Sequence, residues 1–336
     1  MESIRRPRLF VISGLSVLAL VAAACSSGSS STSSGEDSSS SSSSTSSTTT
    51  AEVDSSRVTD LVLDPDHDYG DKYADGILPV GDGLLSLTEP AQGYVYLCRE
   101  TGDGGGAFER GPWFVNDNTE WDVNLKIDVE GEVTWDGEYA MELSDTTRTI
   151  TTNDLPLEHT TGIFPLQASD PAYAYDRNPN SIAAQSLVFG LNASPEVLDT
   201  PSCMGGESGV MNSGVALFNA FDAGNRDASA WEIQDGCHGH PQQTSEYHYH
   251  TLSRCTDDIS VDTVIGFALD GFPITGPQVG ENNILTTSDL DECHGITSTI
   301  TLDDEQVTTY HYVMTADFPY SVSCFRSTPI DAPRAG

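Results

Sequence analysis

The segment SEYHYHTLSRC, residues 245–255, holds the side chains whose types and spacing most favour chemistry. His248 and His250 stand two residues apart between tyrosines, in a chain that has 8 histidines. In an extended strand, successive side chains point to opposite faces, so both imidazoles are predicted on one face and Tyr247 and Tyr249 on the other. Imidazole is a common metal ligand that suits zinc, copper, nickel and iron. The segment therefore predicts two adjacent metal ligands on one strand.

Most of the other histidines lie in or beside related motifs. Two belong to Asp-x-Cys-His-Gly motifs, one follows the first of these motifs, and one lies in the later segment TYHYV. The candidate metal ligands are His238, His240, His248, His250, His294 and His311. A disulfide that holds the Cys-His-Gly loop near the strand would make His238 the third ligand of an ion shared with His248 and His250. The competing interpretation is that these histidines only form buried hydrogen bonds.

Three carboxylates accompany the candidate ligands. Asp235 and Asp291 each precede the motif cysteine by two residues, and Glu292 adjoins Cys293. A carboxylate that accepts a hydrogen bond from a ligand imidazole fixes the orientation of that ring, and one beside metal-bound water acts as a base. Because acidic residues are abundant in this chain, the alternative is that the three belong to an acidic surface.

The C-terminal part of the chain repeats itself. Residues from about 214 to 255 contain GVALFNAF, EIQDGCHGH and EYHYHTLSRC, and residues from about 266 to 324 contain GFALDGFP, DLDECHGI and TYHYVMTADFPYSVSC in the same order. The first segment of each copy predicts a hairpin, with its turn at residues 270–271 in the second copy and at residues 218–219 in the first. The order of motifs predicts one structural unit used twice.

The cysteines outside the N-terminal leader are even in number. They are Cys98, Cys203, Cys237, Cys255, Cys293 and Cys324. Such a set in an exported chain indicates disulfides. The duplication predicts that one bond closes each copy, Cys237 with Cys255 and Cys293 with Cys324, which leaves Cys98 for Cys203. A bond across the copies, from Cys237 to Cys293, also respects the symmetry and stays open as an alternative.

The rest of the folded part also has the composition of strands. Short β-branched and aromatic runs bounded by Gly, Asp, Asn and Pro predict strands within residues 93–98, 122–143, 160–166 and 186–192. Residues 179–187 have the pattern of a short helix. The chain is therefore predicted to be mainly β, as a disulfide-stapled β sandwich or barrel-like domain with an internal duplication in its C-terminal part.

The N-terminus resembles a bacterial lipoprotein leader. Three early arginines precede an apolar run that ends in LVAAAC at Cys25, which is the pattern of a signal peptide. The tail resembles a lipobox, although Ala22 stands where leucine is commonest. We expect residues 1–24 to be removed, Cys25 to carry the lipid, and the Ser/Thr-rich residues 25–57 to form a tether. Secretion without a lipid is the alternative.

The organisation beyond the tether is an N-terminal β region, 58–186, and a C-terminal domain, 187–336, that holds both copies. The whole chain has a formal net charge of −37 at pH 7. Such a charge repels nucleic acid and anionic lipid and favours cations, or it serves only solubility. The expected partners are a membrane, through the lipid anchor, and a metal ion, with no nucleic acid.

The segments GCHGHPQQTSEYHYHTLSRC, GFALDGFPITGP and LDECHG, followed by FPYSVSCFR, resemble the YHYH-domain family of exported bacterial proteins. The resemblance covers about residues 187–326. It implies export and metal binding through the histidines, while no reaction is established for the family. Members often carry Tyr-His-Tyr-His in the second copy too, so the departure at Val313 argues against a symmetric pair of sites.

Three functions compete on this basis. The first is a lipoprotein, anchored at the outer face of a bacterial membrane, that binds copper or zinc through the clustered histidines. The second is a metal-dependent extracellular enzyme, a hydrolase or an oxidoreductase, since the same ligands serve a site with an open coordination position. The third is a structural or adhesive β module without metal.

Overall fold

The computed structural model describes residues 61–100 and 106–334. The predicted signal peptide, the lipidation at Cys25 and the tether lie outside the described residues and stay predictions. The described part is mainly β, as predicted, and belongs to one unit, Ser56–Gly336. Within the described ranges, no helix has the length and apolar character needed to cross a membrane.

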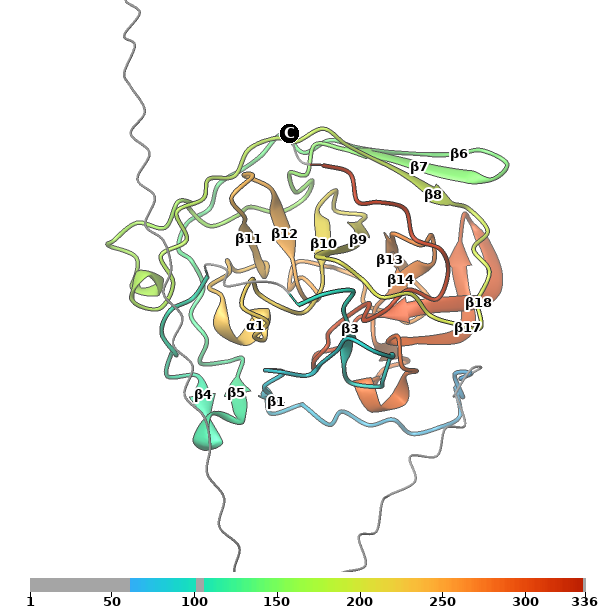
Figure 1. The fold of residues 1–336 in the computed structure, drawn as a ribbon, viewed down its shortest axis with the longest axis horizontal. Helices are drawn as coiled ribbons and strands as arrows, with labels where there is room; N and C mark the ends of the chain where they lie inside the picture. The colour runs from blue at the N-terminus through green and yellow to red at the C-terminus, as the bar shows by residue number, and fades with distance from the viewer. Residues whose placement is uncertain (1–60, 101–105, 335–336) are drawn as a thin grey trace, which may run out of the picture. The chain divides into compact units, whose positions relative to one another are not determined.

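The C-terminal half builds one eight-stranded sheet with the order β11-β12-β10-β9-β13-β14-β18-β17 (Figure 1). Its strands are β9 (Glu207–Met211), β10 (Ala216–Phe218), β11 (Gly239–Pro241), β12 (Tyr247–Tyr249), β13 (Val264–Ala268), β14 (Pro273–Thr275), β17 (Gly295–Leu302) and β18 (Glu305–Val313). The order begins with β11 and ends with β17, so this is an open sheet.

The duplication appears as symmetry about the central β9–β13 pair. β9 pairs with β10 and β13 with β14, both antiparallel. β10 then pairs with β12, and β14 with β18, both parallel. The outer pairs, β11 with β12 and β17 with β18, are again antiparallel. Each copy therefore contributes four strands with the same pairing directions.

The predicted turn of the first hairpin was wrong. Phe218 lies in β10, and the hairpin turns earlier, where the Gly214 N–H donates to the Met211 carbonyl over 2.9 Å. The matching bond in the second hairpin joins the Gly271 N–H to the Ala268 carbonyl, also over 2.9 Å. Gly214 and Gly271 have φ values of 87° and 92°, which glycine adopts without a steric penalty. The first copy therefore begins at β9, and the Gly-x-Ala-Leu similarity had aligned two different strands.

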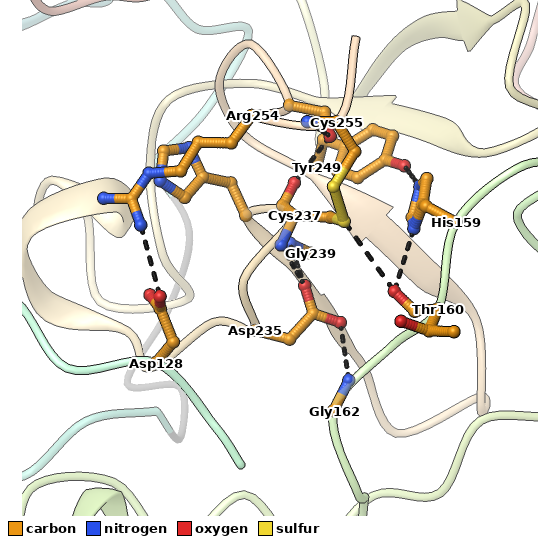
Figure 2. Close-up of a disulfide and its surroundings, with 12 residues drawn as sticks. Asp128, His159, Thr160, Gly162, Asp235, Cys237, Gly239, Tyr249, Arg254 and Cys255 are labelled. Atoms are coloured by element: carbon orange, nitrogen blue, oxygen red, sulfur yellow. Dashed lines mark hydrogen bonds and ion pairs between the residues drawn. A yellow bond between two sulfur atoms is a disulfide. The ribbon is translucent and has the colours of Figure 1, made fainter. Parts of the chain in front are cut away.

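The Asp-x-Cys-His-Gly motif is a tight turn leading into the outer strand of each copy. Asp235 Oδ1 accepts hydrogen bonds from the N–H groups of Cys237 over 3.0 Å and Gly239 over 3.2 Å (Figure 2). The Tyr247 hydroxyl also donates to this oxygen, over 3.0 Å. One carboxylate thus joins the turn to the neighbouring strand β12.

The second copy repeats this arrangement. Asp291 Oδ1 accepts from the N–H groups of Cys293 over 3.0 Å and Gly295 over 2.9 Å, and from the Tyr310 hydroxyl over 3.1 Å. The histidine of each motif has a positive φ, 64° in the first copy and 71° in the second. The turn geometry therefore belongs to the duplicated unit.

All three predicted disulfides are present. Cys237 bonds to Cys255, Cys293 to Cys324, and Cys98 to Cys203. The pairing across the copies does not occur. Each of these two disulfides, Cys237–Cys255 and Cys293–Cys324, links the Cys-His-Gly turn of its copy to the segment that follows the Tyr-His-Tyr strand, β12 or β18.

The N-terminal part adds small sheets around this core. They contain β1 (Ile77–Pro79), β2 (Leu85–Ser86), β3 (Val95–Tyr96), β4 (Phe114–Val115), β5 (Glu120–Asp122), β6 (Tyr139–Leu143), β7 (Thr147–Thr152) and β8 (Leu187–Asn192). The remaining elements are α1 (Ala228–Trp231), β15 (Gln278–Val279), β16 (Asn283–Ile284) and the 3₁₀ turns η1 (Asn116–Asn118), η2 (Pro171–Ala174) and η3 (Thr287–Asp289).

Two local predictions in this region were wrong. Residues 179–186 form no helix, and the chain enters β8 at Leu187. Residues 160–166 form no strand, and Thr161 makes only an isolated bridge to Val133. In β8 every second side chain is buried. The apolar side chains on this face pack against the main core, as the period of two expected for a strand requires.

The glycine that ends each Asp-x-Cys-His-Gly motif lies against the tyrosine of the neighbouring strand. A Cβ at Gly239 would overlap the ring of Tyr247, and one at Gly295 would overlap the Tyr310 hydroxyl. Because Asp235 and Asp291 hold these tyrosines in place, we expect Gly239→Ala and Gly295→Ala each to lower the free energy of unfolding by roughly 1–3 kcal/mol. Urea denaturation measures this change. Gly236→Ala is the matched control, since a Cβ there meets no atom within 4 Å; equal midpoints for the control and Gly239→Ala would contradict the prediction.

Candidate metal centre

Pairing of β11 with β12 brings three histidines together. His240 lies directly opposite His248 in this antiparallel pair, and His250 follows β12 on the same face as His248. All three side chains are 3% exposed. One ring nitrogen of each lies within 4.8 Å of the others, which is close enough for one metal ion. The cluster is therefore a buried, three-imidazole candidate site.

The tyrosines of the same segment point the other way, as predicted. Tyr247 and Tyr249 are fully buried in the main core, where their ring centroids are 5.7 Å apart. The Tyr249 hydroxyl meets His159 Nε2 over 2.5 Å (Figure 2). Alternation along β12 thus separates a packing face from a polar face.

Hydrogen bonds fix which nitrogen of two histidines can bind a cation. His250 Nδ1 lies 2.5 Å from the Asn219 carbonyl oxygen, and His248 Nδ1 lies 3.4 Å from the Glu246 carbonyl oxygen. A carbonyl only accepts, so each Nδ1 carries the hydrogen. In a neutral imidazole the other nitrogen then has a free lone pair. Both Nε2 atoms are therefore ready to act as ligands.

Both rings are neutral because they are buried. Burial lowers the pKa of His250 to about 4, and burial together with the neighbouring His250 lowers the pKa of His248 well below its usual value. The two Nε2 atoms are 3.1 Å apart. In the tautomer with both hydrogens on Nδ1, the two Nε2 lone pairs face each other, and a cation between them would take both as ligands. In the other tautomer of His248, its Nε2–H donates to His250 Nε2.

The third histidine has no hydrogen bond at either ring nitrogen, although it is buried. His240 Nε2 lies 3.4 Å from Glu232 Oε2, and this oxygen also lies 3.4 Å from His250 Nε2. Glu232 Oε2 itself has no hydrogen-bond partner. Burial, with the charges of Asp222 and Asp176, raises the pKa of Glu232 well above its usual value. Buried polar groups without partners cost free energy, which indicates a missing ligand.

These distances fit a small transition-metal ion. Zinc–nitrogen bonds of about 2.0–2.1 Å at tetrahedral angles place neighbouring ligand atoms about 3.3 Å apart. The His248–His250 separation and the two distances from Glu232 are close to this value. His248 and His250 thus fit as ligands, His240 has a ring nitrogen within 4.8 Å of theirs, and Glu232 lies where it would complete the site or act on a bound group.

The cluster lines a cavity of about 820 Å³. Its walls include Phe218, Asp222 and Asn178 in addition to the histidines and Glu232. The Phe218 and His248 ring centroids are 4.2 Å apart, so this aromatic side chain supports the ligand ring. The cavity gives the candidate site room for a molecule beside the ion.

His238, the predicted third ligand, lies outside the cluster. Its Nδ1 is 3.2 Å from the Leu252 carbonyl oxygen, and its side chain lines a different cavity. His238 is the turn residue with a positive φ, which directs it away from β12, whereas His240 lies in register with His248. The structure therefore places His240 where the sequence had placed His238.

The second copy keeps the fold and lacks the cluster. His311 corresponds to His248, but its ring nitrogens pair with Thr275 Oγ1 over 2.9 Å and Ser298 Oγ over 2.8 Å. Its cross-strand partner is Ile296, and Val313 stands where the first copy has His250.

The other motif histidine of the second copy is also hydrogen-bonded. His294 Nε2 pairs with Thr315 Oγ1 over 3.0 Å. Burial lowers the pKa of His294 to about 3 and that of His311 to about 4. Both are neutral core histidines, His311 with both ring nitrogens hydrogen-bonded and His294 with its Nε2 hydrogen-bonded.

The three predicted carboxylates serve other partners. Asp235 and Asp291 bind the amides of their turns, and Glu292 accepts from Arg326 Nη1 over 2.8 Å. None of their described hydrogen bonds reaches a histidine ring. Glu232 fills that place instead and was missed, although it opens the quoted segment EIQDGCHGH. Its burial depends on packing that the spacing does not encode.

A second group of possible metal ligands consists of one histidine and two cysteines, His159, Cys237 and Cys255. The two sulfurs are bonded to each other, as Figure 2 shows, so they offer no thiolate. The His159 ring already contacts the Thr160 carbonyl oxygen over 3.0 Å as well as Tyr249. This cluster is a disulfide packed beside an imidazole.

Comparison with known proteins gives one match. A family model described as YHYH protein matches residues 188–284, a stretch that contains all three clustered histidines and Glu232. No curated protein and no solved structure matches the chain. Residues 188–284 are therefore similar to the YHYH family over that stretch of the chain.

Proposed function

We propose that this protein is an exported, lipid-anchored metal-binding protein that holds one copper or zinc ion at His240, His248 and His250. The observation that carries the proposal is the group of three buried histidines, each with a ring nitrogen within 4.8 Å of the others. A bound cation would use these nitrogens as ligands. The unpartnered His240 ring and Glu232 oxygen beside it support the same conclusion.

The ligand set limits the metal. Three neutral imidazoles with a carboxylate and no thiolate suit zinc and copper better than magnesium or calcium, which prefer oxygen ligands. In the second copy, hydroxyl groups occupy both ring nitrogens of His311 and Nε2 of His294. The proposal is therefore one ion per chain.

Export and anchoring rest on the leader and the disulfides. The leader has the pattern of a lipoprotein signal peptide, and the three disulfides are typical of an oxidising compartment. The lipid on Cys25 would hold the folded part at the outer face of the membrane through the Ser/Thr-rich tether. This would put the metal site where it meets ions or molecules from outside.

A second candidate function is metal-dependent catalysis, and the cavity beside the cluster favours it. Three protein ligands leave a coordination position open, and a metal there would supply Lewis acidity and activate water. Glu232 lies 3.4 Å from two ligand nitrogens, so it is placed to accept or return a proton. The 820 Å³ cavity would admit a small substrate. Metal-dependent turnover that Glu232→Gln abolishes without loss of metal would favour this function.

Replacing a cluster histidine should remove the metal. We expect His240→Ala, His248→Ala and His250→Ala each to reduce bound copper or zinc from about one ion per chain to near zero, because two imidazoles are a poor site. Elemental analysis of exported protein and calorimetric titration measure the stoichiometry.

The second copy provides the matched control for this experiment. His311→Ala, at the position equivalent to His248, should leave one ion per chain. Retention of metal by His240→Ala together with its loss from His238→Ala would instead restore the third ligand expected from the sequence.

Metal binding should release a proton from Glu232. Burial raises the pKa of this carboxyl well above its usual value, so we expect it to hold its proton in the metal-free site beside neutral imidazoles. A divalent ion favours the carboxylate, so binding near pH 6 should release about one proton and should weaken as the pH falls. Titration calorimetry in buffers of different ionisation enthalpy counts the proton.

The isosteric variant Glu232→Gln tests the source of that proton. It should bind with no proton release, and its affinity should stay constant until the pH approaches about 4, the pKa of His250. Unchanged proton release in Glu232→Gln would show that the proton comes from another group.

A further inference from the structure

A second cavity of about 350 Å³ lies between the first copy, the second copy and the N-terminal part. It does not share a lining residue with the cavity of the histidine cluster. Most of its walls are apolar, and they include Leu78, Val123, Leu252, Ile259, Pro277 and Ile284. The aromatic side chains of Trp121 and Tyr320 complete the apolar lining.

Three polar side chains form one cluster in the wall of this cavity. Lys126 Nζ donates to the Ser229 carbonyl oxygen and, over 3.3 Å, to Gln234 Oε1. Ser229 is 1% exposed and Gln234 is 3% exposed. All three residues line the cavity. The two acceptors hold the ammonium group at a fixed place in an apolar wall.

Each member of this cluster has hydrogen-bonding capacity left over. Gln234 Nε2 and Ser229 Oγ are buried without a hydrogen-bond partner. An ammonium group carries three N–H donors, and the described bonds of Lys126 use two of them. Buried donors without acceptors cost free energy. The cluster therefore contains polar groups that lack a partner.

The charge of the cluster favours an anionic acceptor. Burial lowers the pKa of Lys126 to about 8, so the group remains cationic at neutral pH. Three carboxylates lie near enough to act on Lys126: Asp128, Asp227 and Glu232. Asp128 accepts from Arg254 Nη1 over 3.2 Å, Asp227 accepts from the Tyr320 hydroxyl over 2.8 Å, and Glu232 belongs to the histidine cluster. Neither Asp128 nor Asp227 accepts a described hydrogen bond from Gln234 Nε2 or Ser229 Oγ. A carboxylate has two oxygens to accept from such a group.

We propose that this cavity binds a small monocarboxylate with an apolar body, whose carboxylate accepts from Lys126, Gln234 and Ser229. The volume is at the lower end of the range for small-molecule sites. The apolar walls would cover the body of the ligand, and the donor cluster would fix its charged end. This site is independent of the metal and of the proposed function of the histidine cluster.

Three eight-carbon probes of equal chain length test the charge preference. Octanoate, 1-octanol and octylammonium are each titrated into the full exported protein, with binding measured by calorimetry. Octanoate should bind at least ten-fold more tightly than 1-octanol, and octylammonium more weakly than either. Equal affinity for octanoate and 1-octanol, tighter binding of octylammonium, or no binding of octanoate would each overturn the proposal.

Two variants locate the bound carboxylate. Lys126→Met removes the cation, and Gln234→Glu replaces a donor by an acceptor while keeping an oxygen for Lys126. Each should weaken octanoate binding at least ten-fold. Lys72→Met, which removes an exposed lysine outside the cavity, is the matched control and should bind as the wild type does.

The second variant keeps the test decisive if the first fails to fold. Gln234→Glu retains the partner of Lys126, and its thermal unfolding shows whether the fold is intact. A folded Gln234→Glu protein with wild-type affinity for octanoate would overturn the assignment of the donor cluster.

Discussion

The carboxylate of Asp235 is the constraint on which the histidine site depends. It binds two amides of the Cys-His-Gly turn and the hydroxyl of Tyr247, and so fixes the start of β11 against β12. That register places His240 opposite His248. A shift of one residue would turn His240 away from the cluster, because alternate side chains of a strand point to opposite faces. Metal-binding chemistry in this chain thus rests on a buried network that does not itself touch the histidine cluster.

The duplication separates what the fold needs from what the site needs. Both copies keep the capped turn, the tyrosines of the Tyr-His-Tyr strand and the disulfide. Only the first copy keeps three imidazoles, since Ile296 and Val313 occupy the corresponding places in the second. The remaining His311 is satisfied by two hydroxyls. The same architecture therefore exists with and without the cluster, which indicates that the cluster is not required for folding.

The sequence predicted the parts of this arrangement that depend on local pattern. Alternation in Tyr-His-Tyr-His predicted the two faces of β12, and the order of motifs predicted all three disulfides. It did not predict which histidine is third, because His238 lies in the turn with a positive φ while His240 pairs in register with His248. Glu232 was missed because its position depends on α1 and on distant packing. The turn of the first hairpin was misplaced because Gly-x-Ala-Leu resembles two different strands of the unit.

Anomalous X-ray diffraction from crystals of the exported protein, recorded at the zinc and copper absorption edges, tests the central claim most directly. We predict one peak per chain, bonded to the Nε2 atoms of His240, His248 and His250, with none at His294 or His311. If crystals grown with zinc and crystals grown with copper both show no peak at the cluster, with His248 and His250 still in contact, the claim is contradicted.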